Sequence, residues 1–166
     1  GGLGHMAVQI LQALTPALLI AGDIDDARLE HARRLGVRHT VNTRDADAAT
    51  TAIAQLVGAR GVTVVLDFVG AQPTVDLAVR IVGRNSHIAV VGLGGGVLHY
   101  GANSPPYGCQ VTVPYWGSRT ELMEVVALAA AGRIRADIET FPLEQAVDVY
   151  RRLREGKIRG RAVLTP

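Results

Sequence analysis

The chain opens with a glycine-rich turn that runs directly into an apolar helical pattern. Gly1-Gly2-Leu3-Gly4 precedes apolar residues that recur at helical spacing, which predicts a helix over residues 5–14. Thr15-Pro16 ends the pattern, because proline cannot continue a helix. Gly1 and Gly4 have the spacing of the second and third glycines of G-x-G-x-x-G, so the first glycine and the strand before it would lie outside the chain.

Such a turn is suited to hold linked phosphates. A glycine at Gly1 lets the backbone approach a pyrophosphate without a Cβ in the way, and Gly4 lets the helix pack closely on a strand. The first turn of the helix then offers unpaired N–H groups and the positive end of its dipole to the phosphates. Half a fingerprint also occurs in ordinary turns, and Gly4-His5-Met6 is compatible with a cloning scar, so the interpretation needs a second feature.

An acidic residue supplies that second feature. Asp23 closes the apolar run of residues 17–22, about 20 residues beyond the glycines, as a dinucleotide-binding fingerprint requires. A carboxylate there accepts hydrogen bonds from both hydroxyls of an adenosine ribose. It would also lie close to the 2′-phosphate of NADP, and like charges 4 Å apart cost on the order of 4 kcal/mol at an effective dielectric of 20. The sequence therefore predicts NAD rather than NADP, although Arg28 could accommodate a 2′-phosphate. The alternative role for Asp23 is a helix cap, which Asp25 or Asp26 serves better.

Strand and helix patterns alternate along the whole chain. The strand pattern at 62–66 has too few polar positions for one face to be in water, which favours a parallel sheet covered on both sides. We predict an α/β fold, a Rossmann-type doubly wound parallel sheet that is incomplete at its amino terminus because the first strand is missing. The predicted elements after the first helix are a strand ending at 23, a helix from 25 or 26 to 36, a strand at 37–41 and a helix at 47–57. The next are strands at 62–66 and 88–91 around a helix from 73, a loop at 103–106 and a strand at 111–113. The last are a helix from a capping box at 118–121 to 131, an extended segment at 134–140, a helix at 143–155 and a strand at 161–164.

Composition excludes several other classes of protein. The 166 residues suffice for one core, and 48% hydrophobic with 19% charged residues is typical of a soluble globular chain. The formal charge of +2 is scattered and no lysine–arginine block is interleaved with aromatics, which indicates no nucleic-acid partner. The apolar run of residues 6–22 is too short and too polar for a membrane span or a signal. Cys109 is the single cysteine, so no internal disulfide is possible and a cytoplasmic location is favoured.

Several segments together resemble zinc-dependent medium-chain alcohol dehydrogenases, over essentially the whole chain and in the family's order. Tyr150 to Gly156 and Pro114-Tyr115-Trp116-Gly117 bring the chain closest to bacterial NAD-dependent enzymes that act on secondary and aryl-substituted alcohols. The zinc-free quinone reductases of the same superfamily usually show valine where Leu3 stands and no histidine at His5. The segments that carry the resemblance are residues 1–9, Asp67-Phe68-Val69-Gly70, Val90-Val91-Gly92-Leu93-Gly94 and Gly160-Arg161-Ala162-Val163-Leu164.

The resemblance implies cofactor-binding roles for these positions. Arg161 would reach back to the pyrophosphate as a charge-assisted donor, although a solvated surface arginine is equally compatible with the sequence. Plain core or cleft lining is the alternative for Phe68, Val69 and Leu93. The implied assignments are the pyrophosphate for Gly1, Gly2, Leu3 and Gly4, the adenosine ribose for Asp23 with Arg28 beside it, the adenine side for Phe68 and Val69, and the nicotinamide for Gly92, Leu93, Gly94, Tyr115 and Trp116.

The chain departs from the family in its metal ligands. Family members bind a catalytic zinc through cysteine, histidine and an acidic residue of an amino-terminal domain, and many also carry a four-cysteine structural zinc there. Cys109 and the five histidines of this chain show no such pairing. We therefore expect no catalytic residue and no metal ligand in this chain, and zinc only in a missing amino-terminal domain. Without a Lewis-acidic zinc to favour the alkoxide, the chain alone should not oxidise alcohols.

The domain organisation follows from the same comparison. We expect a truncated NAD-binding Rossmann domain at residues 1–116 and a carboxy-terminal tail at 117–166 that packs back on an absent catalytic domain. Loss of a central strand would expose several apolar side chains at about 1.5–3 kcal/mol each, against a typical total stability of about 5–15 kcal/mol. The chain is therefore interpreted as part of a longer enzyme.

The leading hypothesis is hydride transfer between a secondary or aromatic alcohol, or its ketone, and NAD. A nucleotide-binding module without chemistry and a zinc-free quinone reductase remain alternatives. A methyltransferase is disfavoured by the strand end at 91–94 and by the segment that contains Arg161. The resemblance also implies that the strand at 110–113 pairs its edge across a two-fold axis, as in family members, so we expect a homodimer or homotetramer.

Overall fold

The computed structural model describes residues 1–102 and 104–166, so Asn103 of the predicted loop lies outside the described residues. The chain divides into two compact units. The first contains residues 1–19, 30–38 and 118–166, and the second contains residues 20–29 and 39–117. Helix α2 (Asp26–Arg34) contributes to both.

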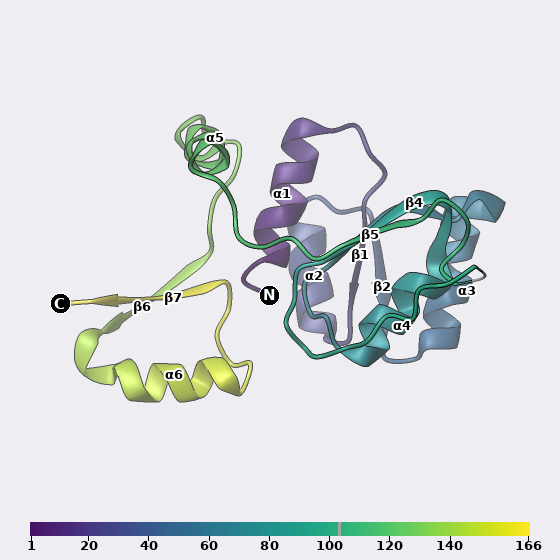
Figure 1. Cartoon of the computed structure of the whole chain (residues 1–166). Coiled ribbons are helices and arrows are strands. Elements are labelled where there is room, and N and C mark those ends of the chain that lie inside the picture. Colours follow the sequence, from purple (N-terminus) through teal and green to yellow (C-terminus); the bar gives the residue numbers. More distant parts are fainter. Residues whose placement is uncertain (103) are drawn as a thin grey trace. The chain divides into compact units, whose positions relative to one another are not determined.

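The second unit alternates strands and helices, and all of its paired strands are parallel (Figure 1). The pairing joins β1 to β2 in one sheet and β3, β4 and β5 in another, in that order. Among the described residues β1 and β3 are not paired, so the predicted parallel strands form two short sheets. The elements are β1 (Ile20–Asp23), β2 (His39–Asn42), α3 (Ala46–Val57), the short 3-10 turn η1 (Gly58–Arg60), β3 (Val62–Asp67), α4 (Gln72–Ile81), β4 (Val82–Val90) and β5 (Gln110–Thr112).

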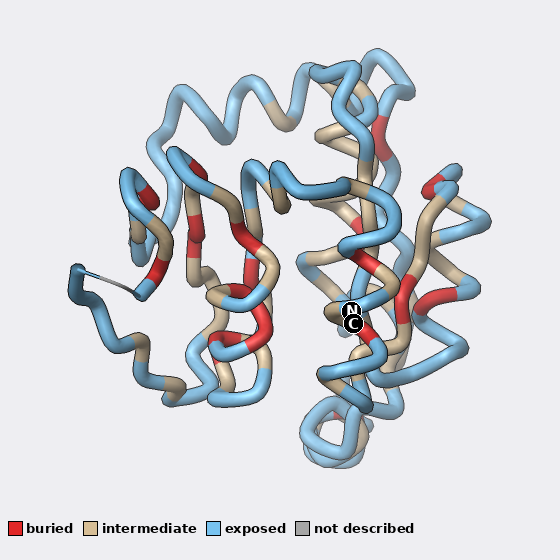
Figure 2. Tube along the Cα trace, turned by 90° about the vertical axis from the view of Figure 1, so that its right-hand side faces the viewer, coloured by how far each residue is buried: buried red, intermediate tan, exposed pale blue. Residues whose placement is uncertain are grey.

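Helices α3 and α4 pack on both sheets and close the core of this unit. One buried cluster joins Val41 of β2 to α3 and α4, and Ile20 of β1 and Val62 of β3 pack against it. A second cluster is centred on Ile88 of β4, which is fully buried beside Cys109. Figure 2 shows the buried residues as short stretches between more exposed ones.

Local chemistry explains where these helices begin and end. The Asp45 carboxylate accepts the N–H groups of Asp47 and Ala48 and starts α3, and Gly58 ends it with φ of +66°. Pro73 occupies the first turn of α4, where its missing N–H costs nothing. Strand β4 follows α4 directly and is longer than the predicted 88–91, because its pairing with β3 continues back to Val82.

The first unit contains α1 (Gly4–Leu14), the carboxyl end of α2, α5 (Arg119–Ala130), β6 (Ile138–Pro142), the short 3-10 turn η2 (Leu143–Gln145), α6 (Ala146–Arg154) and β7 (Arg161–Thr165). Strands β6 and β7 pair in parallel and are connected through α6 (Figure 1). The Gln9 side chain of α1 exchanges hydrogen bonds with the backbone N–H and carbonyl of Arg135, both at 2.9 Å. The predicted extended segment at 134–140 is regular only from Ile138, and the predicted helix at 143–155 begins as a 3-10 turn.

Helix α5 begins with the predicted capping box. The Ser118 side chain accepts the Glu121 N–H at 3.2 Å, and the Glu121 carboxylate accepts the Ser118 N–H at 2.6 Å. Hydrogen bonding to Ser118 holds the pKa of the Glu121 carboxyl below its usual range. Across the described ranges 1–102 and 104–166, every helix is too short or too polar to cross a lipid bilayer.

Candidate functional site

The glycine-rich turn leads into α1 without a side-chain cap. Leu3 occupies the N-cap position, and no acidic residue lies in the first turn. The Gly1 carbonyl accepts the His5 N–H at 3.1 Å, whereas no acceptor for the N–H groups of Leu3 and Gly4 is found among the described residues. The start of α1 therefore offers free donors and the positive end of its dipole, as an anion-binding turn requires.

Gly2 is the crowded glycine of this turn. A Cβ on Gly2 would lie 2.8 Å from the Gly160 carbonyl oxygen and 3.2 Å from Nη1 of Arg161. A Cβ on Gly1 or Gly4 would meet no described atom within 4 Å. Gly2 thus marks the place where the start of β7 passes over the turn, and the Arg161 guanidinium lies beside it.

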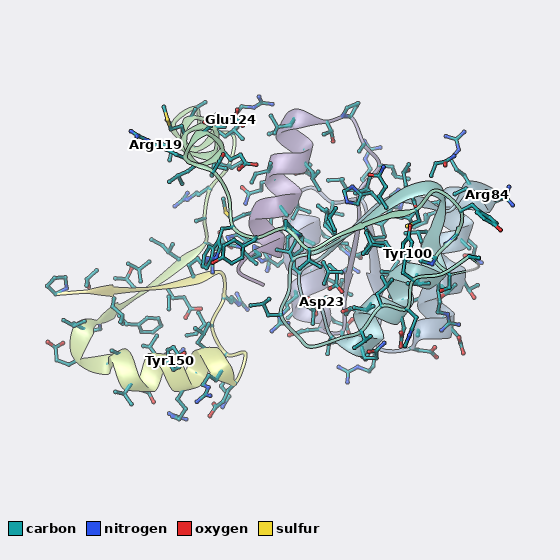
Figure 3. All side chains as sticks on the ribbon, viewed as in Figure 1. Asp23, Arg84, Tyr100, Arg119, Glu124 and Tyr150 are labelled. Atoms are coloured by element: carbon teal, nitrogen blue, oxygen red, sulfur yellow. The ribbon has the colours of Figure 1, made fainter. Side chains whose placement is uncertain are left out.

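Asp23 ends β1 in the second unit, and its position is labelled in Figure 3. Its side chain is 24% exposed, and Nη1 of Arg28 lies 3.6 Å from its Oδ1. Arg28 also contacts the carboxylate of Asp25, with Nε 3.7 Å from Oδ2. The single guanidinium of Arg28 is therefore shared by two carboxylates.

The alternative role considered for Asp23, a helix cap, is taken by Asp25. Asp25 caps α2, because its Oδ1 accepts the Ala27 N–H at 2.8 Å, whereas the Asp23 side chain accepts the Asp25 N–H at 3.0 Å, before the helix begins. Sequence reasoning missed Arg44, whose guanidinium donates to the Ile24 carbonyl at 3.0 Å and so lies on the same loop. The feature of the sequence that could have indicated Arg44 is its position just after the second strand.

The ends of β3 and β4 are joined beyond their strands. The Gly92 N–H donates to the Asp67 carbonyl at 3.0 Å, and the Gly94 N–H donates to the Val69 carbonyl at 2.9 Å. The buried Asp67 carboxylate holds the turn from inside, because its Oδ1 accepts the N–H groups of Val69 and Gly70 at 2.9 Å each. The structure thus brings together two groups of predicted residues, 68–69 and 92–94.

Glycines make this close approach possible. A Cβ on Gly70 would lie 2.2 Å from the Gly92 carbonyl oxygen, and one on Gly94 would lie 2.7 Å from the Val69 carbonyl oxygen. The side chains between them face outward, with Val69 55% and Leu93 95% exposed. Apolar side chains so exposed at the carboxyl ends of parallel strands are typical of a ligand-facing surface.

The remaining predicted residues differ in their surroundings. Phe68 is half-buried, whereas Tyr115 and Trp116 are exposed after β5 and contact each other edge to face, with ring centroids 6.0 Å apart. Trp116 has φ of +55°, an uncommon value for a bulky residue. These two rings follow the carboxyl end of a strand in the same sheet as Phe68 and Leu93.

The side chains present do not fit a zinc ion. Residues 1–102 and 104–166 contain no group of three or more histidine, cysteine, aspartate or glutamate side chains that could hold a metal. Cys109 is buried, and its thiol donates to the Gln110 carbonyl at 3.6 Å.

The chain matches known proteins along its length. Residues 2–131 match the family described as zinc-binding dehydrogenase. A curated alcohol dehydrogenase from Moraxella sp. (strain TAE123) is 36% identical over 99% of this chain and 48% of its own length. The chain thus spans about half the length of the curated relatives it matches.

Solved structures show the same likeness. The alcohol dehydrogenase from the archaeon Aeropyrum pernix superposes with a TM-score of 0.89 and 38% identity, over all of this chain and 48% of that one. Acetophenone reductase from Geotrichum candidum NBRC 4597, solved with NAD, gives a TM-score of 0.82 and 27% identity, over all of this chain and 46% of that one. The Rossmann-like α/β fold predicted from the sequence is thereby confirmed. This chain belongs to the zinc-binding dehydrogenase family.

Proposed function

We propose that this chain supplies the NAD-binding part of a zinc-dependent alcohol dehydrogenase that transfers hydride between a secondary or aromatic alcohol and NAD. The observation that carries the proposal is the position of the Arg161 guanidinium, whose Nη1 lies 3.2 Å from where a Cβ on Gly2 would be, beside a helix start without a side-chain cap. A guanidinium and free backbone donors are the groups that recognise a pyrophosphate. Family membership and a relative solved with NAD support the same cofactor.

In this proposal the first unit binds the two phosphates. The N–H groups of Leu3 and Gly4 would donate to phosphate oxygens, and Gly1 and Gly2 would let those oxygens approach the backbone. Arg161 would add charge-assisted hydrogen bonds. The donors are fixed before the ligand arrives, because α1 and β7 hold them, so little ordering free energy is lost on binding.

The two ends of the cofactor would be recognised at the carboxyl ends of strands. Asp23 would accept hydrogen bonds from the adenosine ribose, and because Arg28 is already shared between two carboxylates, the Asp23 carboxylate would repel a 2′-phosphate. Phe68 and Val69 would flank the adenine side. The nicotinamide would lie against Gly92, Leu93 and Gly94, and against Tyr115 and Trp116. Bound NAD supplies the hydride acceptor.

The substrate proposal rests on similarity and on exposed aromatics. The relatives named above are called alcohol dehydrogenases or acetophenone reductase, which supports small alcohols and ketones, including aryl-substituted ones. Tyr115 and Trp116 would provide apolar surface for such a group. We propose that zinc is bound by residues outside this chain, in a catalytic domain, because no set of described side chains fits it.

The domain boundary and the assembly are also proposals. We place the NAD-binding domain at residues 1–116 and a tail that packs on the catalytic domain at 117–166. No side chain of α5 is buried, and Leu122, Met123 and Val126 are exposed, which supports a partner surface for this helix. We further propose a homodimer or homotetramer that acts in the cytoplasm, a location favoured by the single cysteine.

Cofactor titration of the natural protein, purified in the form its gene encodes, tests the central claim. NADH should quench protein fluorescence at saturation, and Arg161→Gln should raise the dissociation constant roughly 10-fold or more, since a charge-assisted hydrogen bond is lost. Arg119→Gln on the exposed face of α5 is the matched control and should leave NADH binding unchanged (Figure 3). Wild-type protein that does not bind NADH would refute the proposal.

A panel of alcohols tests the reaction. Oxidation of secondary or aryl alcohols with NAD should be lost after treatment with a zinc chelator and restored by added zinc. Activity that survives removal of all metal would contradict the zinc-dependent assignment while leaving the cofactor assignment intact.

A further inference from the structure

His5 is buried in the first unit, with 4% of its surface exposed, and both of its ring nitrogens are hydrogen-bonded. Its Nε2 lies 3.1 Å from the backbone nitrogen of Asp137, and its Nδ1 lies 3.1 Å from the Gly1 carbonyl oxygen. An amide N–H can only donate, so Nε2 must accept. A carbonyl oxygen can only accept, so Nδ1 carries the proton and donates to Gly1. The ring therefore has one fixed tautomer between two fixed backbone groups.

The Gly1 carbonyl is held twice by the same residue. It accepts the backbone N–H of His5 at 3.1 Å as well as the ring Nδ1–H. A trans peptide is planar, so fixing the direction of the Gly1 carbonyl also fixes the opposite direction of the Gly2 N–H. Two successive glycines would otherwise allow this peptide to rotate at little cost. His5 thus determines where a backbone donor of the turn points.

On the other side of the ring, hydrogen bonds through Asp137 connect His5 to Arg161. The Asp137 N–H that binds His5 belongs to the same residue whose carbonyl accepts the Arg161 N–H at 2.8 Å. Gly160 has φ of +57°, and a Cβ on it would lie 2.1 Å from that carbonyl, so the backbone passes closely there. His31 secures Asp137 further, with its Nε2 2.7 Å from the carboxylate, and its ring stacks on that of His5 at 5.9 Å.

We propose that His5 is a positioning residue for the phosphate-binding turn, which sets the Gly1–Gly2 peptide on one side of its ring and, through Asp137, sets Arg161 beside Gly2 on the other. The contacts form a closed circuit from Gly1 through His5, Asp137 and Arg161 back to Gly2. This inference rests on the proposed role of the turn and of Arg161 in binding the pyrophosphate of NAD.

The test compares ligands with and without phosphates on the natural full-length protein. ADP-ribose contains the pyrophosphate, whereas adenosine contains none. His5→Leu keeps the bulk but removes both hydrogen bonds, and it should raise the dissociation constants of NADH and ADP-ribose roughly 10-fold while that of adenosine changes less than about twofold. His99→Leu, at an exposed loop histidine, is the matched control and should change none of the three.

Two conservative variants test the two sides of the ring. His5→Asn keeps a donor near the Nδ1 position, and His5→Gln keeps an acceptor near the Nε2 position. Each should recover part of the ADP-ribose affinity that His5→Leu loses. Because His5 acts partly through Arg161, His5→Leu combined with Arg161→Gln should weaken ADP-ribose binding by less than the product of the two single effects.

Each outcome decides one claim. Equal loss of ADP-ribose and adenosine affinity would show that His5 only stabilises the fold, and strictly multiplicative effects would show that it does not act through Arg161. If His5→Leu fails to fold by circular dichroism, the Asn and Gln variants decide: wild-type ADP-ribose affinity in both overturns the inference. Wild-type protein that binds neither NADH nor ADP-ribose would refute the proposed function itself.

Discussion

At the scale of single residues, a small number of side chains carry the recognition we propose. Asp23 keeps a partly exposed carboxylate at the end of β1, and Arg28 divides its charge between Asp23 and Asp25. Surface ion pairs of this geometry are weak, so Arg28 remains able to move. The preference for NAD that we propose therefore depends on the sum of charges on the loop after β1 rather than on Asp23 alone.

Removing that charge should change cofactor preference. In Asp23→Asn, which keeps an acceptor oxygen but no charge, NADPH should bind at least about 10-fold more tightly relative to NADH, since electrostatic repulsion of a 2′-phosphate is relieved. Asp45→Asn, at the cap of α3 in the same unit, changes the net charge equally and should leave the ratio unchanged. Competition titration with both cofactors measures it, and an unchanged ratio in Asp23→Asn would contradict the assignment.

The residue scale is also where sequence reasoning was strongest and where it failed. Spacing predicted Asp23 and the glycine turn, because a strand, a turn and a helix start are local. It did not predict that Gly2 is the crowded position of the turn. That crowding comes from Gly160 and Arg161, some 160 residues away along the chain, and no local pattern reports such a contact. The two-sided hydrogen bonding of His5 was missed for the same reason.

At the scale of elements, helix ends were predicted well and strand limits less well. The capping box at Ser118 and the ends at Gly58 and Pro73 depend on side chains next to the backbone they satisfy. Strand β4 extends over nine residues because its pairing with β3 continues back to Val82, which depends on the neighbouring strand. Helix α5 combines a complete capping box with no buried side chain. The capping box therefore contributes a larger share of its stability than in a helix that buries an apolar face.

Acid should weaken the start of α5. Because the pKa of Glu121 is lowered in the folded protein, its carboxylate stabilises the fold above the ordinary glutamate pKa of about 4.3, and this contribution is lost as pH falls through the lower folded value. Glu121→Gln should therefore lower the unfolding midpoint in urea at pH 7, and by progressively less as the pH falls below the ordinary glutamate pKa. Glu124→Gln on the same helix (Figure 3) is the control, and an equal effect of both variants at pH 7 would contradict a specific cap.

At the scale of the whole molecule, the exposed edge of β5 is the feature with the widest consequence. Strand β5 pairs only with β4 among the described strands, and Val113 at its end is exposed. Unpaired edges promote association unless a charge or a partner covers them. The sequence pattern predicted the strand and the family resemblance implied that its edge is paired, but the partner depends on a second surface that no local pattern describes.

Disrupting that edge should change the size of the assembly. We expect the natural protein to be a dimer or tetramer at micromolar concentration by light scattering, and Val113→Lys to shift it toward the monomer, because a buried lysine at an interface is unfavourable. Val97→Lys, at another exposed valine of the same unit, should leave the mass unchanged. A monomeric wild-type protein would refute the proposed assembly.

The glycine contacts between the ends of β3 and β4 also restrict how this chain could change over evolutionary time. Gly70, Gly92 and Gly94 leave no room for any side chain, so substitutions there would open the backbone itself. Val69 and Leu93 project outward between them and tolerate replacement without strain. Natural drift or laboratory selection for new cofactors and substrates should therefore accumulate at those two positions, on a backbone platform that stays constant.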